Sequence, residues 1–323
     1  MNNTGKKTVS YLIKATIIIL AFVFIYRRLN DNTGLKQFET LVGGINRGWA
    51  IYSMALVFIL MLVNWILEAV KWKYLAKRLA NISLWRSIEA VFCGLTLAIF
   101  TPNRIGEYGG RVMFLPQRKR IHGVFAMAVG SFGQNVITNV LGAIALMWFI
   151  WHFMAINLWL YIGLLIISSV FALLMLLFYF NIRWMVSLLN SVKFLKKFHR
   201  FFDIMGRYRF TELVYIMGFC LARYAVFSFQ YYLVIHLLIP QIPLYDILMM
   251  VFILFFIQSA LPSLDLLDIG VRNLTGGTLF AYVTDQKIAV MAAITSIWLI
   301  NLIIPAILGS VFVFKLKFFD NNL

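Results

Sequence analysis

Two short stretches combine charged residues with proline and glycine, and each directly follows an apolar run. The first, TPNRIGEYGGR at residues 101–111, contains Arg104, Glu107 and Arg111. A charge within a membrane costs about 3 kcal/mol by insertion scales, so it usually serves a function and has a partner nearby. We expect Glu107 to pair with one arginine and the other arginine to bind an anionic group such as a lipid phosphate. The alternative is an ordinary loop at the membrane interface.

The second stretch, SALPSLDLLDIGVRN at residues 259–273, contains Asp265, Asp268 and Arg272. The two aspartates would be suited to a coupling site for a proton or a cation. An ion pair between Asp268 and Arg272 is the alternative, because the two residues lie four positions apart. Both stretches therefore contain candidate binding residues within apolar surroundings.

One further run places three polar residues on the same side of a helix. Asn64, Glu68 and Lys71 are spaced by four and then three residues, which is the spacing of one helix face. We expect Glu68 and Lys71 to form a surface pair, and Asn64 is a substrate-binding candidate. Arg223 is another charge inside an apolar run and is a candidate for mutation.

A polar patch interrupts the apolar run at 124–151. It consists of four residues, Gln134, Asn135, Thr138 and Asn139. Such residues often form hydrogen bonds between helices within a membrane. The alternative is that they line a cavity, and on this interpretation Gln134 and Asn135 are substrate-binding candidates.

The usual signatures of enzymes and metal sites are missing from the sequence. The four histidines lie in separate segments without carboxylates at metal-ligand spacing, and no serine or cysteine has a nearby base. Cys93 and Cys220 both lie in apolar runs, which is typical of buried thiols. We therefore expect no catalytic residue, no metal site and no cofactor.

The composition indicates an integral membrane protein. Hydrophobic residues make up 62% of the 323 positions and charged residues only 13%, whereas soluble domains have about 25% charged residues. The formal net charge is +17, but the lysines and arginines fall in short loops between apolar runs. That distribution is typical of membrane anchoring, so we expect no nucleic-acid partner.

The apolar runs predict an all-α polytopic fold with six transmembrane helices and two re-entrant hairpins. Two runs, 84–100 and 244–261, end abruptly at Thr101-Pro102 and Leu261-Pro262, which is typical of a helix that breaks within the membrane. The runs long enough to cross about 30 Å of hydrocarbon are 9–26, 49–67, 124–151, 158–180, 211–238 and 288–314.

Loop charges predict the orientation. Loops 152–157 and 239–243 contain no lysine or arginine, whereas the loops on the other side and the C-terminal tail contain most of the basic residues. The exception is 27–48, with Arg27, Arg28, Lys36 and Arg47. By the positive-inside rule, both termini are predicted to be cytoplasmic, in a bacterial-type cytoplasmic (inner) membrane. The basic segment 181–210 is expected to lie at the membrane interface, with a substrate-recruiting or partner surface as the alternative.

The two broken segments also indicate an inverted repeat. A shift of 160 positions aligns 85–102 with 245–262 without a gap and places Pro102 on Pro262. We expect one membrane domain, 1–323, built from a half at 9–151 and an inverted half at 158–314. Many secondary transporters have this architecture, and their broken helices line a central cavity.

These motifs are similar to those of the transmembrane region of lysylphosphatidylglycerol synthases and their stand-alone flippase-like relatives. The Pro-x-x-x-Gly-Glu turn of that family matches Pro102, Gly106 and Glu107. This chain departs from the second turn of the family, because it has Asp268 where a glycine is usual and Asn273 where a glutamate is usual. No role of that family glutamate is therefore assigned to Asn273. The resemblance implies movement of lipids or lipid-linked sugars between leaflets. In the synthases a separate cytoplasmic domain transfers the amino acid from tRNA, and we expect this chain to be a stand-alone form without it.

The sequence hypothesis is therefore a flippase-like transporter of an anionic phospholipid or a polyprenyl-phosphate-linked substrate. Its partners would be membrane lipids with a phosphate, and enzymes of envelope-lipid biosynthesis. The alternatives are a membrane enzyme that modifies lipid or glycan, and a scaffold subunit of an envelope-synthesis complex. The expected substrate-binding residues are Arg104, Glu107, Arg111, Asp265, Asp268, Arg272, Asn64, Gln134 and Asn135.

Overall fold

The computed structural model describes residues 47–99, 101, 104–193, 199–261 and 268–313, and within these ranges it gives no side-chain description for Arg200 and Asp268. The predicted first transmembrane run, 9–26, lies outside the described residues. So do both prolines of the predicted breaks and Asp265.

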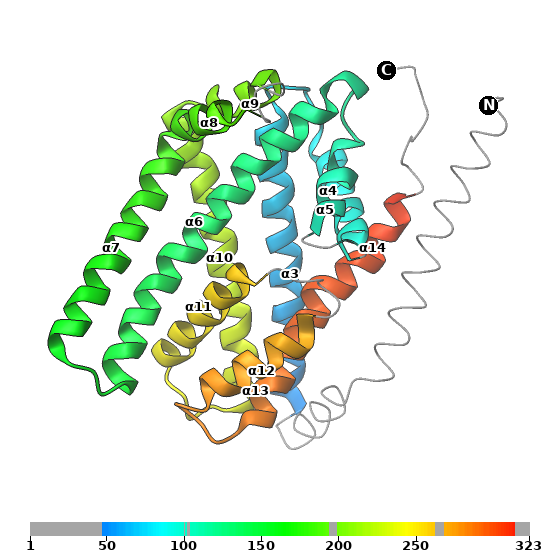
Figure 1. The fold of residues 1–323 in the computed structure, drawn as a ribbon. Coiled ribbons are helices and arrows are strands. Elements are labelled where there is room, and N and C mark those ends of the chain that lie inside the picture. The colour runs from blue at the N-terminus through cyan, green and yellow to red at the C-terminus, as the bar shows by residue number, and fades with distance from the viewer. Residues whose placement is uncertain (1–46, 100, 102–103, 194–198, 262–267, 314–323) are drawn as a thin grey trace.

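Within the described ranges, five helices are long and apolar enough to cross a membrane (Figure 1). Each predicted run in these ranges coincides with a helix to within a few residues, except that the helix over 49–67 continues for two more turns. The all-α membrane fold is therefore confirmed. The helices are α3 (Arg47–Ala76), α6 (Arg120–Phe153), α7 (Leu158–Phe180), α10 (Phe210–Leu238) and the continuous stretch of α13 (Lys287–Trp298), the π-helical η4 (Leu299–Ile303) and α14 (Ile304–Val313).

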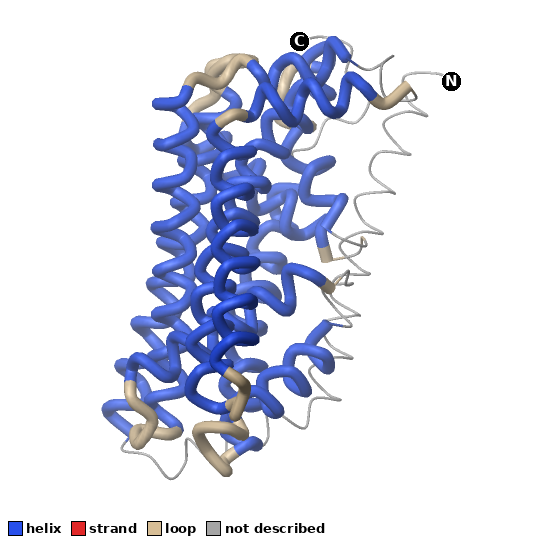
Figure 2. Tube along the Cα trace, turned by 60° about the vertical axis from the view of Figure 1, so that its left-hand side comes forward, coloured by secondary structure: helices blue, strands red, loops and turns tan. Residues whose placement is uncertain are grey.

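Two helical hairpins reach toward each other from opposite ends of the molecule. The first consists of α4 (Leu84–Ala98) and α5 (Ile105–Val112), and the second of α11 (Leu244–Ala260) and α12 (Asp268–Phe280). Figures 1 and 2 place the ends of α4 and α11 near mid-height, so neither helix spans the molecule. Both helices end just before the predicted prolines. The division into two repeat halves stays a prediction.

Close backbone contacts hold the first hairpin together. A Cβ on Gly110 would lie 2.6 Å from Cα of Gly94, and one on Gly106 would lie 2.2 Å from the carbonyl oxygen of Leu97. On the other side of α4, a Cβ on Gly309 of α14 would lie 2.1 Å from the carbonyl oxygen of Phe92. Glycine is therefore required where α5 and α14 approach α4, as is common between membrane helices.

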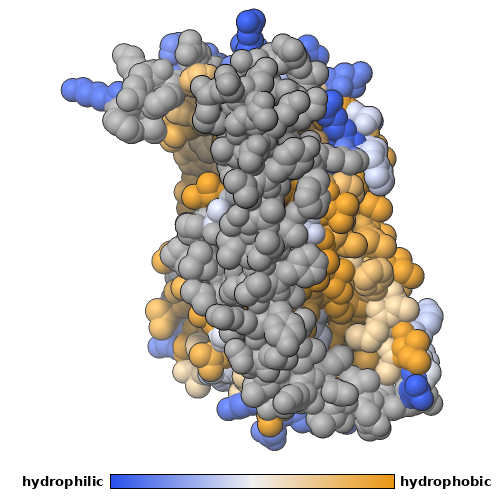
Figure 3. All heavy atoms as spheres, turned by 90° about the vertical axis from the view of Figure 1, so that its right-hand side faces the viewer, coloured by the Kyte–Doolittle hydropathy of each residue, from blue (hydrophilic) through white to orange (hydrophobic). Residues whose placement is uncertain are grey.

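Short helices cover one end of the bundle. The 3-10 turn η2 (Gln117–Lys119) precedes α6, and α8 (Ile182–Ser191) and α9 (His199–Gly206) lie across the top in Figure 1. The hydroxyl of Tyr208, which follows α9, donates to the carbonyl oxygen of Leu75 over 2.8 Å. This bond ties the predicted interfacial segment to the end of α3. In Figure 3, hydrophilic side chains gather at the two ends of the molecule and hydrophobic ones lie between them.

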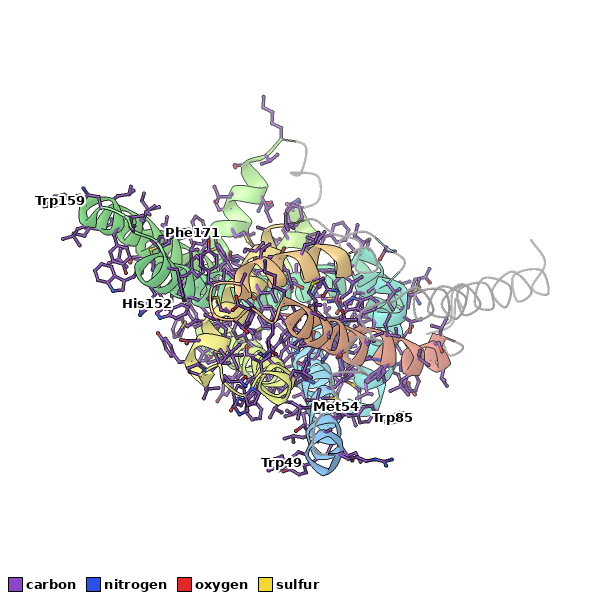
Figure 4. All side chains as sticks on the ribbon, turned by 90° about the horizontal axis from the view of Figure 1, so that it is seen from below. Trp49, Met54, Trp85, His152, Trp159 and Phe171 are labelled. Carbon is purple, nitrogen blue, oxygen red and sulfur yellow. The ribbon has the colours of Figure 1, made fainter. Side chains whose placement is uncertain are left out.

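Helix α7 lies at the edge of the molecule. Its most apolar 18-residue window contains no buried residue, and Figure 4 shows Trp159 and Phe171 on this outlying helix. Trp159 near the start of α7 and Trp49 near the start of α3 both project outward in that view, and their side chains are exposed. Exposed tryptophans at helix ends are typical of the boundary between lipid and water.

Candidate functional site

A network of buried ion pairs connects α3, α5 and α10. Glu68 of α3 accepts hydrogen bonds from Arg111 of α5 and Arg223 of α10, and it lies 2.7 Å from the Lys71 ammonium. Glu107 of α5 pairs with Arg111 and lies 2.9 Å from Nε of Arg104. The two carboxylates therefore share four basic side chains, which come from α3, α5, α10 and the turn that precedes α5.

Helical spacing explains the convergence on α3. Asn64, Glu68 and Lys71 are all buried on the same helix face, as their spacing predicts. Nε of Arg223 donates to Oδ1 of Asn64 over 2.9 Å, and its guanidinium lies 5.3 Å from the ring centroid of Trp65. Arg223 is thus held by an amide, a carboxylate and an aromatic face at once.

The turn between α4 and α5 is also locally fixed. Arg104 precedes α5 with a φ of 57°, which is the only positive φ of a non-glycine residue among the described positions. This conformation costs about 1–2 kcal/mol in an L-residue, so surrounding contacts must hold it. The backbone N–H of Gly106 donates to Oγ1 of Thr101 over 2.7 Å, and Arg104 pairs with Glu107.

The network brings several basic side chains to two carboxylates. Among the described side chains of this network, Glu68 and Glu107 supply two negative charges, whereas Lys71, Arg104, Arg111 and Arg223 supply four positive ones. Glu68, Lys71 and Arg111 are buried, where water screens charge weakly. A group of basic side chains at such a place favours an anionic ligand.

A cavity of about 690 Å³ opens beside this network. Arg104 and Glu107 of the first hairpin contribute to its lining, and so do Leu261 and Arg272 of the second. The cavity therefore lies between the two hairpins. Its volume is within the range of about 300–1,000 Å³ that is usual for small-ligand sites.

The rest of the lining combines neutral polar side chains with aromatic ones. The polar group contributes amides and hydroxyls from α6, α11 and η4: Ser131, Gln134, Asn135, Thr138, Gln258, Ser259 and Asn301. The aromatic group comes mainly from α10 and its neighbours: Trp65, Tyr224, Phe227, Tyr231, Phe255 and Trp298.

Some of the predicted site residues line the cavity in the structure and others do not. Arg104, Glu107, Arg272, Asn64, Gln134 and Asn135 all line the cavity. Asp265 lies outside the described residues, and Asp268 begins α12 without a described side chain. The predicted alternatives for the aspartates, coupling site or ion pair, therefore stay predictions. Asn139 of the polar patch donates to the backbone oxygen of Asn135 and does not line the cavity.

Two details of the sequence hypothesis are wrong. We expected one arginine of the first turn to remain unpaired, but both Arg104 and Arg111 pair with Glu107. Arg111 is 1% exposed and lies behind the cavity lining, because α5 packs directly against α4. The Glu68–Lys71 pair exists, but it is buried and not at the surface, because α10 covers that face of α3.

Sequence reasoning did not select several lining residues. Gln258, Ser259 and Asn301 each interrupt a strongly apolar run, and this signal was available for all three. Ser131 has no such signal, and its hydroxyl accepts from the Tyr108 hydroxyl over 2.9 Å. Arg223 was noted only as an isolated charge, because its partners on α3 lie more than 150 positions away in the sequence.

Metal-binding groups are not apparent in the part of the chain that the structure describes. No three histidine, cysteine, aspartate or glutamate side chains there come together in a way that could hold a metal ion. Cys93 and Cys220 are buried thiols, and Sγ of Cys220 lies 3.9 Å from the Lys71 ammonium.

Comparison with known proteins places the chain in a family. The model of the lysylphosphatidylglycerol synthase transmembrane region matches residues 11–309, which is nearly the whole chain. No curated protein and no solved structure matches it. The chain therefore belongs to the family of the lysylphosphatidylglycerol synthase transmembrane region, whose members are membrane proteins of lipid-related processes.

Proposed function

We propose that this protein moves an anionic, phosphate-bearing lipid between the two leaflets of the membrane, with the headgroup bound in the cavity between the hairpins. The observation that carries this proposal is the group of four basic side chains that, among the described residues, share two carboxylates beside a cavity of about 690 Å³. A lipid phosphate would be attracted to that group, whereas apolar tails would remain in the bilayer.

Within this function, Arg223 and Arg104 are the residues that hold phosphate. Both line the cavity, and their side chains are partly exposed, at 15% and 38%. Glu68 and Glu107 keep the two guanidinium groups in place in the empty state. Arg111 is buried behind them and acts as a positioning residue, because it joins the two glutamates.

The arrangement of the hairpins supports transport over static binding. Broken helices that meet near the middle of a membrane are a common basis of alternating access, since one part of the bundle can rock against the other around a fixed site. By the positive-inside rule, the end that carries α8 and α9 faces the cytoplasm of a bacterial-type cell. An enzyme of envelope-lipid biosynthesis on that side would supply the lipid.

Leaflet exchange in reconstituted vesicles tests the proposal. A fluorescent-tailed phosphatidylglycerol is placed in both leaflets, and the fraction that an added reductant cannot reach is followed over time. We expect exchange with the wild-type protein and at least about a tenfold slower rate with Arg223→Gln, because a charge-assisted hydrogen bond contributes about 1.5–3 kcal/mol. The matched control is Arg118→Gln, which removes a charge from the exposed turn before α6.

The same vesicles separate the alternatives. Mass spectrometry of the recovered lipid would reveal covalent modification if the protein were an enzyme. Exchange that is equally fast with Arg223→Gln would remove the arginine from the mechanism. No exchange by folded wild-type protein would contradict the proposal and favour a scaffold.

A further inference from the structure

Helix α8 has three distinct sides, and one of them packs on the protein. Ile182 and Val186 are buried, and they belong to the same apolar cluster as Phe202 and Met205 of α9. Residues four positions apart share one side of a helix, so this side of α8 is the one that α9 covers. The other two sides of α8 face away from α9.

A second side of α8 is apolar and yet exposed. Trp184, Leu188 and Val192 follow one another at intervals of four residues and are 53%, 56% and 48% exposed. Large apolar side chains that gather on one exposed surface indicate contact with lipid or with another protein. The surroundings of this side decide between the two.

Trp184 connects the exposed apolar side of α8 to the surface of α7. Its ring lies edge-on to the ring of Phe178 near the end of α7, with 6.3 Å between the centroids. One turn earlier on α7, Leu174 is exposed. Because the most apolar part of α7 has no residue buried in the protein, its outer surface faces lipid. The apolar side of α8 therefore continues a lipid-facing surface, and tryptophan is typical of the level where lipid meets water.

The third side of α8 is polar, and the segment around it is basic. Arg183, Ser187 and Ser191 are exposed on this side, and Lys193 is exposed just after the helix. In the sequence, the segment 181–210 contains seven lysines and arginines but only one acidic residue. Each basic residue close to an anionic membrane surface contributes about 1 kcal/mol of attraction. The charge of the segment therefore favours an anionic partner.

We propose that α8 lies in the plane of the membrane and binds the anionic lipid surface at its end of the bundle. The side that consists of Trp184, Leu188 and Val192 enters the boundary between headgroups and acyl chains, as the apolar face of an interfacial helix does. Arg183 and Lys193 pair with lipid phosphates, and the polar side faces water. This surface is separate from the cavity between the hairpins, and the inference does not depend on the proposed function.

The bound lipid surface is connected to two helices that line the cavity. The ring of Phe202 in α9 lies 4.9 Å from the ring of Phe125 in α6. Tyr208, directly after α9, donates to the carbonyl oxygen of Leu75 in α3. Because α8 packs on α9, attachment of α8 to lipid fixes the position of these ends of α3 and α6 relative to the membrane surface.

Spin labels at two neighbouring residues test the orientation of α8. Leu188→Cys and Ser187→Cys each place one label on the full chain, in vesicles of phosphatidylglycerol and phosphatidylcholine. The native Cys93 and Cys220 are buried, and wild-type protein measures any background labelling. Electron paramagnetic resonance gives the collision rates of the label with oxygen, which concentrates among acyl chains, and with a water-soluble nickel chelate. We expect a clearly higher ratio of oxygen to nickel collisions for Leu188→Cys than for Ser187→Cys.

The charge of the lipid tests the basic residues. In vesicles of phosphatidylcholine alone, the ratio for Leu188→Cys should fall, because the anionic surface is absent. Arg183→Gln combined with Lys193→Gln should lower the ratio to the same value in the mixed vesicles, whereas Arg183→Lys should retain it. The matched control, Arg47→Gln with Lys287→Gln, removes two exposed charges at the starts of α3 and α13, at the opposite end of the molecule (Figure 1), and should leave the ratio unchanged.

Three results would overturn the inference. Equal or nickel-favoured ratios for Leu188→Cys and Ser187→Cys would place the apolar side in water and favour a soluble protein as its partner. Exclusion of both reagents from the label of Leu188→Cys would show that protein and not lipid covers this side. A ratio unaffected by Arg183→Gln with Lys193→Gln would remove the two residues from the binding of anionic lipid.

Discussion

Each hairpin consists of two helices, but different interactions hold the two hairpins. The first is fixed by ion pairs: Arg111 of α5 joins Glu107 of its own helix to Glu68 of α3. Among the described contacts of the second, α11 packs on α6 and α10 through an apolar face that includes Met250 and Leu254, and Asn273 of α12 is hydrogen-bonded to Thr295.

This difference indicates that the first hairpin is held in place and that the second can move. Ion pairs and backbone contacts are directional, so they hold the first hairpin at one position beside the cavity. Apolar packing is not directional, so α11 can shift along its neighbours at lower cost. We therefore expect the first hairpin to be sensitive to single substitutions and the second to be tolerant.

Replacement of Arg111 should have the largest effect. Arg111→Leu leaves two buried carboxylates with fewer partners, and loss of one member of a buried ion pair costs about 3–5 kcal/mol. We expect a strongly lowered unfolding temperature, measured by thermal unfolding of the purified protein in detergent. The control Arg118→Leu removes an exposed arginine and should have little effect. Equal stability of Arg111→Leu and wild type would contradict the idea that ion pairs anchor the first hairpin.

Alanine in place of a closely packed glycine of the first hairpin should have the second largest effect on stability. Gly110→Ala places a methyl group 2.6 Å from Cα of Gly94, and overpacking of this kind costs about 1–3 kcal/mol. Gly109→Ala, one position earlier, meets no atom within 4 Å and should be neutral or stabilising. In the second hairpin, Gly277→Ala meets the Met291 side chain at an ordinary 3.5 Å and should also be tolerated. Comparison of the three unfolding temperatures checks this, and similar losses for all three would remove the distinction between the hairpins.

The smallest effect is expected for a hydrogen bond of the second hairpin, between Asn273 and Thr295. Thr295→Val removes the hydroxyl that bonds Asn273 but keeps the shape of the side chain. The expected loss is about 1 kcal/mol, the net value of one hydrogen bond. Thr278→Val is a suitable control, because its hydroxyl only bonds backbone carbonyls of its own helix. A loss as large as that of Arg111→Leu would show that the second hairpin is held as firmly as the first.

The fold was largely predictable because hydrophobic run length reports directly on helices in a membrane. The run at 158–180 coincides with α7. The two broken runs coincide with α4 and α11, and both helices end shortly before the prolines that predict the breaks. The burial of a helix face could not be predicted in the same way, because periodicity states which residues share a face but not which element covers it. Glu68 and Lys71 were therefore assigned to the surface, although α10 buries them.

The site was predictable only where charge and helix breaks coincide. Arg104 and Glu107 were found in this way, and both line the cavity. The role of Arg111 was not predictable, because its burial depends on the close contact of Gly94 with Gly110 across the hairpin. Asn301 and Gln258 each interrupt an apolar run, but only tertiary packing shows that both line the same cavity.

The central claim is that an anionic lipid headgroup occupies the cavity between the hairpins. An experimental structure of the protein in nanodiscs of phosphatidylglycerol tests it most directly. The account predicts phosphate density within hydrogen-bonding distance of the Arg223 guanidinium. A cavity that contains only water, with ordered lipid confined to the outer surface of the helices, would contradict it.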